Sequence, residues 1–350
     1  MDVNLLRQNE YSGTLSDSTA LPLRTIWHKS APDAVRKAFR SGKDSKGWSA
    51  WRKHLARRGR PLPLSELLPS KTSPLAWCLP GDVDKGRFLA LLEQIERLCS
   101  GGDAGASKAE QEVLAWLADA AGSPPAAGQT MEALAWCHAL PRMAGKLPPE
   151  VWWDLLEHLR AAATEPDAVA LDRDPLACQL LAGELPLTLA YLFGEIAPCR
   201  KLGRKARREL STGLVELLDG EGLPHAEQLA VLRPLLACWT RCRAIGNESG
   251  KGCCNEAAQT QYEWLVRQAL RLVRPDGAQV FSRGTSGAWC EELFDAAICY
   301  GGDGDDRKIA ALVLPGRNES DRAPVRKRAL APPGVHSEWA AVGVLRPDWA

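Results

Sequence analysis

Three side chains that can transfer protons occur in the middle of the chain: Glu184, Tyr191 and His225. A phenol can donate or accept a proton, and a histidine, with an unperturbed pKa of about 6.5, is suited to carry protons near neutral pH. His225 follows the Gly-containing loop DGEGLP and is expected at a helix start, where the helix dipole favours the neutral imidazole. These residues are therefore candidates for general acid and base chemistry.

Each of these side chains also has a structural interpretation. Tyr191 can be a core residue whose hydroxyl is satisfied by a neighbour. Glu184 lies in the apolar stretch GELPLTLAYLFGE, and because an unpaired buried carboxylate is costly, it either pairs with an arginine of another helix or faces a cleft. His225 can equally be an ordinary exposed histidine at a helix start.

The segments that would position these residues are helical. From Gly81 onward, apolar residues recur at the spacing of an α-helix, and short connections marked by Gly or Pro separate the repeats. Helices are predicted at 151–163, 174–193, 201–218, 225–244, 256–273, 286–300 and 303–314. Such helices pair as antiparallel hairpins, which stack into a solenoid or close into an α/α toroid. The lack of a fixed sequence period disfavours the regular solenoid families.

The texture of the sequence divides the chain into four parts. These are an irregular, basic N-terminal segment (1–60), a helical domain (61–314), a polar linker (315–334) and a strand-like tail (335–350). A lone strand is not stable by itself. The tail therefore either adds to the helical domain or begins a β-domain that is truncated at Ala350, and the second interpretation is the simpler one.

The stretch from Ala34 to Arg60 carries ten Lys or Arg against the single acid Asp44, with Trp48 and Trp51 among them. Basic charge interleaved with aromatic residues is typical of nucleic-acid binding, and an acidic polysaccharide could bind in a similar way. We favour two short amphipathic helices whose charges face water, so nucleic acid is not the expected partner. The residues predicted to pack inward are Val35, Ala38, Phe39, Trp48, Trp51 and Leu55.

The cysteines and short motifs predict no metal and no cofactor. Eleven cysteines is an odd number, and several lie in apolar helical stretches, where free cysteine behaves as a small hydrophobe. Cys238 and Cys242 would share a helix face near Cys253 and Cys254, but the spacing matches no zinc signature. The segment 303–305 begins like a calcium loop, lacks its final glutamate, and is better interpreted as a helix start. No phosphate-binding loop, dinucleotide fingerprint or zinc-protease motif occurs.

Composition sets limits on location and partners. A net charge of +1 predicts no overall attraction to polyanions, although local patches can still bind them. No apolar run approaches the roughly 20 residues needed to cross a bilayer. The start, MDVNLLRQNEY, lacks the pattern of a secretory signal. We therefore expect a cytoplasmic protein with no membrane partner, or a secreted or periplasmic one if the start is mis-assigned; the sequence does not predict the oligomeric state.

Two segments, VRPDGAQVFSRGTSGAW near the end of the helices and HSEWAAVGVLRPDW in the tail, support a family resemblance. With the order of helices followed by a strand-like tail, they resemble the heparinase II/III-like polysaccharide lyases over roughly Leu62 to Ala350. The resemblance implies an α/α toroid (an incomplete barrel), followed in that family by a β-sandwich. It also implies β-elimination of polysaccharides that contain uronic acid, with an acidic polysaccharide as the partner.

β-Elimination needs a group that neutralises the uronate carboxylate, a base that removes the C5 proton and an acid that protonates the departing oxygen. Under the resemblance, Tyr191, His225 and Glu184 are the candidates for proton transfer. The candidates for substrate binding are Arg233, Trp239, Arg241, Arg283 and Trp289, because arginine can hold a carboxylate through two hydrogen bonds and tryptophan can stack on a sugar. Interhelical packing explains several of them equally well. Two rival functions stay open: a non-catalytic helical scaffold, and a nucleic-acid binder that uses the basic N-terminal segment.

Overall fold

The computed structural model describes residues 23–101, 106–121, 126–164, 173–282, 286–316 and 330–349. These residues are mostly α-helical and include one two-stranded sheet, so the all-α class predicted from the sequence is confirmed. The helices are α1 (Asp33–Arg40), α2 (Asp44–Arg57), α3 (Leu64–Leu67), α4 (Lys85–Ser100), α5 (Ala106–Ala121), α6 (Ala127–Met143), α7 (Pro149–Thr164), α8 (Pro175–Cys178), α9 (Leu185–Leu192), α10 (Ala197–Glu216), α11 (Leu232–Glu248), α12 (Glu256–Arg271), α13 (Glu291–Gly301) and α14 (Gly304–Val313). A π-helical turn, η6 (Gln179–Glu184), joins α8 to α9.

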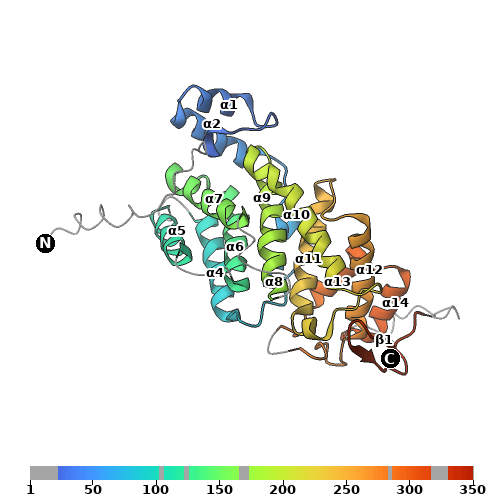
Figure 1. Cartoon of the computed structure of the whole chain (residues 1–350). Helices are drawn as coiled ribbons and strands as arrows, with labels where there is room; N and C mark the ends of the chain where they lie inside the picture. The colour runs from blue at the N-terminus through green and yellow to red at the C-terminus, as the bar shows by residue number, and fades with distance from the viewer. Residues whose placement is uncertain are drawn as a thin grey trace.

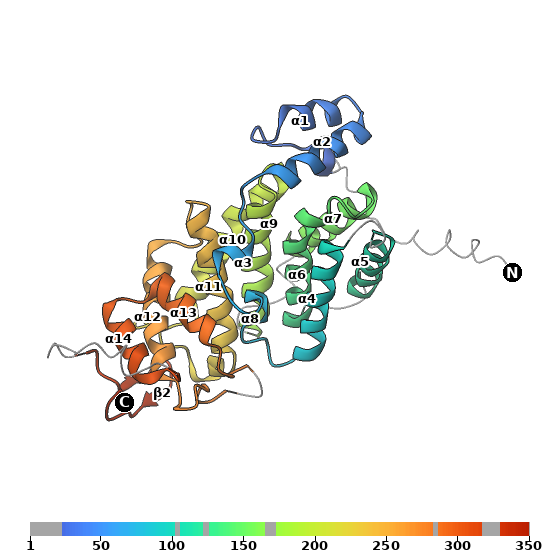
Figure 2. The ribbon, with the colours of Figure 1, turned by 180° about the vertical axis from the view of Figure 1, so that it is seen from behind.

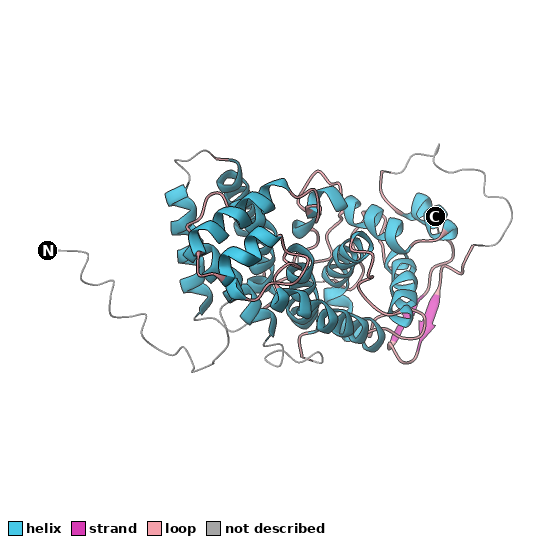
Figure 3. Cartoon of the chain, turned by 90° about the horizontal axis from the view of Figure 1, so that it is seen from above, coloured by secondary structure: helices cyan, strands magenta, loops and turns pink. Residues whose placement is uncertain are grey.

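The helices follow one another across the molecule roughly in chain order (Figures 1 and 2). Helices α4 to α7 lie towards one end and α12 to α14 towards the other, and the view from above in Figure 3 shows the same elongated array. In the middle, α9 packs against α6 and α7 as well as against α10 and α11. This central helix therefore connects the two halves of the core.

Among the described residues, the segment from α8 through α9 forms a long and strongly apolar helix. Pro175–Leu192 is an 18-residue run with a mean hydropathy of 1.2, which by length and composition alone is enough to cross a membrane. The sequence inspection did not anticipate such a run. The protein itself buries 83% of it, as a core helix requires. Gly183 permits close packing, because a Cβ atom at this position would lie 2.7 Å from a methyl carbon of Leu210 in α10.

The described part of the N-terminal basic segment is folded and packed. Helices α1 and α2 turn Val35, Phe39, Trp48 and Trp51 inward, as the amphipathic interpretation predicts. The aromatic rings join a cluster that includes Trp27, Trp152 and Trp153, for example with 4.9 Å between the ring centroids of Trp27 and Trp51. The two tryptophans of the basic stretch therefore serve the core.

Hydrogen bonds also fix the N-terminal segment to the start of α10 and to the residues just before it. The backbone of His28 donates to the carbonyl of Glu195 (2.8 Å), and the backbone of Ala197 donates to the carbonyl of Ile26 (3.0 Å). The carboxylate of Glu195 in turn bonds His54 (2.9 Å) and Arg58 (3.3 Å). As a result, His28 is held beside the first turn of α10.

The C-terminal tail folds back on the helices. Its strands, β1 (Val335–Ser337) and β2 (Val342–Val344), pair antiparallel with each other, so the tract expected as a lone strand is a hairpin. The backbone of Ala226 donates to the carbonyl of Ala340 (2.8 Å), and Arg271 of α12 donates to the carbonyl of Pro332. Of the predicted linker, residues 317–329 lie outside the described residues.

The helix start predicted at 303–305 is confirmed. The side chain of Asp303 accepts hydrogen bonds from the backbone of Asp305 and Asp306, and Asp306 returns a bond to the backbone of Asp303. This reciprocal arrangement satisfies the free N–H groups at the start of α14.

Candidate functional site

Glu184 and Arg241 form a buried ion pair between the centre of the α8–α9 segment and α11. Nε and Nη2 of Arg241 donate to the two carboxylate oxygens at 2.6 and 2.8 Å, and Nη1 donates to the carbonyl of Pro74 at 3.2 Å. Both side chains are almost fully buried. Of the two interpretations of Glu184, the structure shows the pairing with an arginine of another helix. Neither group is free to meet a substrate.

Arg233, which was expected to bind substrate, is also an internal tie. Its guanidinium donates to the backbone carbonyls of Gly277, Gly287 and Ala288, each at 2.6 Å, and lies over the ring of Phe294. The side chain is buried. It holds two segments of the 277–288 region against the start of α11, so its donors are already used.

The two tryptophans expected to form a sugar platform are part of the core. The indole of Trp239 donates to Oε1 of Gln179 (2.9 Å), and its ring is buried. Trp289 stacks on Phe294, with 5.4 Å between the ring centroids. Trp239 is buried and Trp289 is half-buried against the core, and Arg283, the remaining predicted binding residue, lies outside the described residues. The helix predicted at 286–300 begins later, at Glu291, without a side-chain cap at Cys290, and Ser286 donates to the carbonyl of Ala230.

Tyr191 and His225 have separate surroundings. The hydroxyl of Tyr191 donates to the carbonyl of Leu62 (2.9 Å), and burial raises the pKa of this phenol to about 12. His225 caps the short helix at 226–231 by accepting from the backbone of Glu227, and its ring meets the edge of Trp339. The three predicted proton-transfer residues therefore bond to three different sets of partners and do not form one constellation.

Two thiols lie beside the buried carboxylate. Ligand atoms of Glu184, Cys238 and Cys242 come within 4.8 Å of one another, the spacing of a small metal site. Both carboxylate oxygens, however, already accept from the cation Arg241. Burial raises the pKa of both thiols, which keeps them in the neutral form, whereas metal ligation requires the thiolate. The arrangement suits Arg241 better than a divalent cation.

A basic groove follows the exposed face of α10, and we call it the α10 groove. It consists of two adjoining hollows of about 710 and 550 Å³ that share Arg207 and Lys251 in their walls. The cations of the larger hollow are Arg200, Lys201, Arg204, Arg207 and Lys251. Its described lining contains no carboxylate, and the smaller hollow adds Arg208 and one acid, Glu216.

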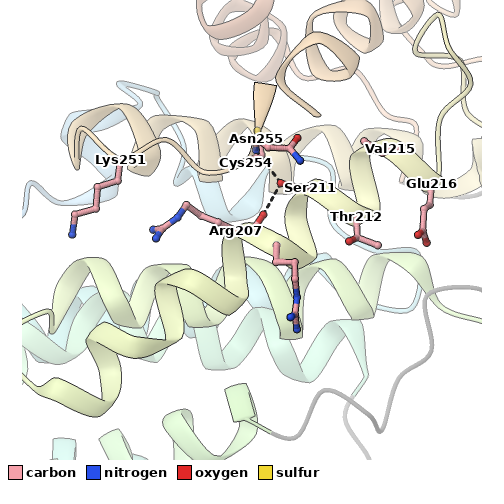
Figure 4. A pocket seen from close by; sticks show the side chains of 9 residues that line it. Arg207, Ser211, Thr212, Val215, Glu216, Lys251, Cys254 and Asn255 are labelled. Atoms are coloured by element: carbon pink, nitrogen blue, oxygen red, sulfur yellow. Dashed lines mark hydrogen bonds between the residues drawn. The ribbon is translucent and has the colours of Figure 1, made fainter. Parts of the chain in front are cut away.

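The walls of the groove come from three separate segments. Arg200, Arg204, Arg207 and Ser211 recur every three or four residues along α10, so they share one face of the helix. The turn between α11 and α12 supplies Lys251, and the segment before α1 supplies His28. Figure 4 shows the smaller hollow, where the hydroxyl of Ser211 accepts from the backbone of Asn255 (2.9 Å) and fastens this turn to α10.

The cations of the groove repel one another. Burial, together with Arg200 and Arg207, lowers the pKa of Lys251. Burial, Arg200, Lys29 and Lys251 lower the pKa of His28. In the described part of the chain, no ion pair within 4 Å joins Arg200, Arg204, Arg207 or Lys251 to an acid. Such a concentration of positive charge is relieved when an anion binds.

The sequence inspection missed this groove, although part of its signal was visible. The run RKLGRKARRE (200–209) places basic residues on successive turns of a helix that was itself predicted. The sequence pattern predicted possible anion binding at the basic stretch 34–60 instead. The contributions of His28 and Lys251 depend on tertiary contacts and leave no local signal.

Comparison with models of protein families, with curated proteins and with solved structures finds no match to this chain. The resemblance to the heparinase II/III-like lyases therefore stays a prediction. The functional proposal rests on the geometry and charge of the α10 groove.

Proposed function

We propose that the protein is a helical binding module that holds an acidic polysaccharide in the α10 groove. One observation carries this proposal: five cations line the larger hollow, and its described lining has no carboxylate to neutralise them. Glu184, one of the three residues considered for proton transfer, and Arg233, Trp239 and Arg241, which were considered for substrate binding, are occupied in structural bonds inside the core. This favours the non-catalytic scaffold among the alternatives.

The spacing of the cations fits an extended ligand with repeated charges. Arg200, Arg204 and Arg207 lie on consecutive turns of α10, and Arg200 is separated from Arg207 by about 10 Å along the helix axis. The second hollow continues past Arg207 to Arg208. A single small anion would contact only part of this row, whereas a chain with regularly spaced carboxylates or sulfates can follow it.

The lining of the groove favours a polysaccharide over a nucleic acid. Proteins that bind single-stranded nucleic acid stack the bases on aromatic side chains. Tyr191 is the one aromatic residue among the described residues that line the larger hollow, apart from the imidazole of His28, and it is half-buried with its hydroxyl bonded to Leu62. Arginine binds carboxylate and sulfate groups by paired hydrogen bonds and needs no stacking surface.

Direct binding tests this proposal. We would titrate the full chain with fluorescent heparin-like oligosaccharides, with a non-sulfated uronate oligosaccharide and with single-stranded DNA of similar charge, at salt concentrations from about 50 to 200 mM. We expect salt-sensitive binding that is tighter for the acidic oligosaccharides than for DNA. Tighter binding to DNA would reassign the groove to nucleic acid, and failure of all three ligands to bind at the lowest salt would refute the proposal.

β-Elimination of uronate polysaccharides is a second candidate. The observation that favours it is that Tyr191, a possible proton donor, borders the same groove as His28 and three arginines. The family resemblance behind this candidate also implies an α/α toroid. The helices in Figure 1 follow one another along the molecule, and this arrangement lends no support to a toroid. An increase in ultraviolet absorbance during incubation with uronate polysaccharides would establish it, because elimination leaves a conjugated double bond. If the protein binds the polysaccharide but the absorbance does not increase, β-elimination is refuted and the binding function is the one that remains.

A further inference from the structure

The smaller hollow of the α10 groove is lined by one of two adjacent thiols, Cys254. Cys253 and Cys254 lie in the turn between α11 and α12, and their Sγ atoms are 3.8 Å apart, with Cys253 as the donor. Cys253 is buried, whereas Cys254 is partly exposed and lines the hollow together with Arg207, Arg208 and Lys251. In Figure 4, Cys254 lies above Ser211, and Arg207 and Lys251 lie to its left.

A buried arginine accompanies this pair. The guanidinium of Arg243 interacts with the sulfur of Cys254, while Nη2 of Arg243 donates to the carbonyl of Tyr300 (3.1 Å). The Arg243 side chain is 7% exposed, and its Nε atom makes no hydrogen bond in the described part of the chain. A buried cation with a free donor beside a sulfur stabilises negative charge on that sulfur.

The two thiols differ in acidity. The hydrogen bond from Cys253, aided by Arg243 and opposed by burial, lowers the pKa of Cys254 to about 7. The same bond and burial raise the pKa of Cys253. Close to neutral pH, a large fraction of Cys254 is therefore the thiolate, which is the nucleophilic form of cysteine.

We propose that Cys254 is a nucleophilic thiol that accepts a mixed disulfide from small disulfides bearing carboxylates, and that Cys253 positions and stabilises it by donating its S–H. In this step, the Cys254 thiolate attacks one sulfur of the disulfide. A new S–S bond forms at Cys254, the S–S bond of the reagent breaks, and the departing thiolate takes a proton from water. The Cys254 sulfur is oxidised, and the departing half of the reagent is reduced to a thiol.

Geometry favours a mixed disulfide over a bond between the two neighbours. Consecutive Cα atoms are about 3.8 Å apart, which is less than the roughly 4.4 Å that an unstrained disulfide needs. A disulfide between Cys253 and Cys254 would therefore be strained and readily reduced. The groove cations add a preference for anionic reagents. That preference rests on the anion groove proposed above, whereas the choice of Cys254 among the thiols does not.

The experiment compares glutathione disulfide, which carries net negative charge, with cystamine, which carries net positive charge. The full chain is treated briefly with each at low salt, quenched with acid and mapped by peptide mass spectrometry. Cys299 is the matched control for exposure, because it is the exposed thiol of the described chain. Cys290 is the control for acidity. A hydrogen bond with Cys78 lowers the pKa of this thiol, and Cys290 lies outside the groove lining.

We expect glutathione disulfide to modify Cys254 before Cys299 and Cys290, and cystamine to react more slowly at the same site. Cys254→Ser should remove this early product. Cys253→Ala should keep Cys254 as the site but raise the pH midpoint of the reaction and lower the rate at pH 7 by up to about tenfold, because loss of the hydrogen bond moves the pKa of Cys254 towards the ordinary thiol value of about 8.5. An unchanged pH midpoint in Cys253→Ala would show that Cys253 does not position or stabilise the Cys254 thiolate.

The remaining outcomes separate the two proposals. Modification of Cys299 ahead of Cys254, in a protein that binds acidic oligosaccharides normally, would overturn the thiol proposal and leave the groove intact. Equal rates with the two reagents at Cys254 would support the nucleophile and overturn the contribution of the groove cations to it. Arg207→Glu with Lys251→Glu should slow glutathione disulfide and speed cystamine at Cys254, and any other pattern would also count against that contribution.

Discussion

Arg241 binds both carboxylate oxygens of Glu184, at 2.6 and 2.8 Å, and this bond joins α11 to the start of α9 inside the core. Burial opposes the charged guanidinium, but the carboxylate beside it raises the pKa of Arg241 nonetheless. A charge pair buried in this way contributes little net stability relative to apolar residues, yet breaking it is costly. Its two members should therefore be substituted together or not at all.

Arg241→Met is expected to lower the free energy of unfolding by about 3–5 kcal/mol, because it leaves a buried carboxylate uncompensated. Glu184→Leu combined with Arg241→Met should recover most of that loss. Urea denaturation followed by circular dichroism measures both. Arg142→Met, which breaks the exposed pair with Glu96, is the matched control and should cost about 1 kcal/mol or less. A double variant no more stable than the single one would contradict this interpretation.

Most of the helices could be predicted from local signals. Helices predicted at 256–273 and 303–314 correspond to α12 (Glu256–Arg271) and α14 (Gly304–Val313). In both cases an apolar stripe is preceded by a capping residue, Asn255 or Asp303, whose side chain accepts from the backbone of the first turn. Such signals need no knowledge of the rest of the fold.

The roles of the polar side chains could not be predicted in the same way. Arg233 bonds carbonyls that lie 44 to 55 residues away, and nothing near Arg233 in the sequence announces them. A basic residue that bonds two loops together and a basic residue that binds a ligand can have the same local sequence. The basic residues of α10 are visible in the sequence as the run 200–209. Only the tertiary contacts that bring His28 and Lys251 to α10 make this basic helix face a groove.

Charge reversal in the α10 groove should weaken the binding of acidic oligosaccharides. For Arg200→Glu with Arg204→Glu we expect a loss of at least about tenfold in affinity at low salt, equivalent to about 1.4 kcal/mol, and a shallower salt dependence. Fluorescence polarisation measures both quantities. Lys205→Glu with Lys37→Glu makes the same change in net charge and is the matched control, because both residues lie outside the groove lining. An equal loss in the control would show a general effect of net charge.

Gly213 of α10 should not tolerate a side chain. A Cβ atom there would collide with the side chain of Gln179, which is held by Trp239 on one side and donates to the carbonyl of Glu209 on the other. Because Gln179 cannot move without losing these bonds, Gly213→Ala is expected to destabilise the fold by about 1–3 kcal/mol in urea denaturation. Gly304→Ala, where no atom lies within 4 Å of the new methyl group, is the control and should be neutral or slightly stabilising.

Stability should fall with acidification because of His138. Burial, with repulsion from Arg241, lowers the pKa of this imidazole from 6.5 to about 3, and its buried Nε2 atom has no hydrogen-bond partner among the described residues. Between these values the unfolded chain binds a proton that the folded chain does not. The contribution of His138 is therefore complete above about pH 6.5 and is lost progressively as the pH falls towards 3.

His138→Gln removes this titrating group. The free energy of unfolding of the variant should therefore fall less steeply between pH 7 and 5 than that of the unsubstituted chain. The difference in slope should be at most about 1.4 kcal/mol per pH unit, the value for one titrating group. Half-buried His158, whose pKa burial also lowers, leaves a residual slope. His336→Gln, at an exposed position of strand β1, controls for the loss of an imidazole as such. Parallel curves for His138→Gln and the unsubstituted chain would mean that His138 is hydrated in the folded protein and titrates as it does in the unfolded one.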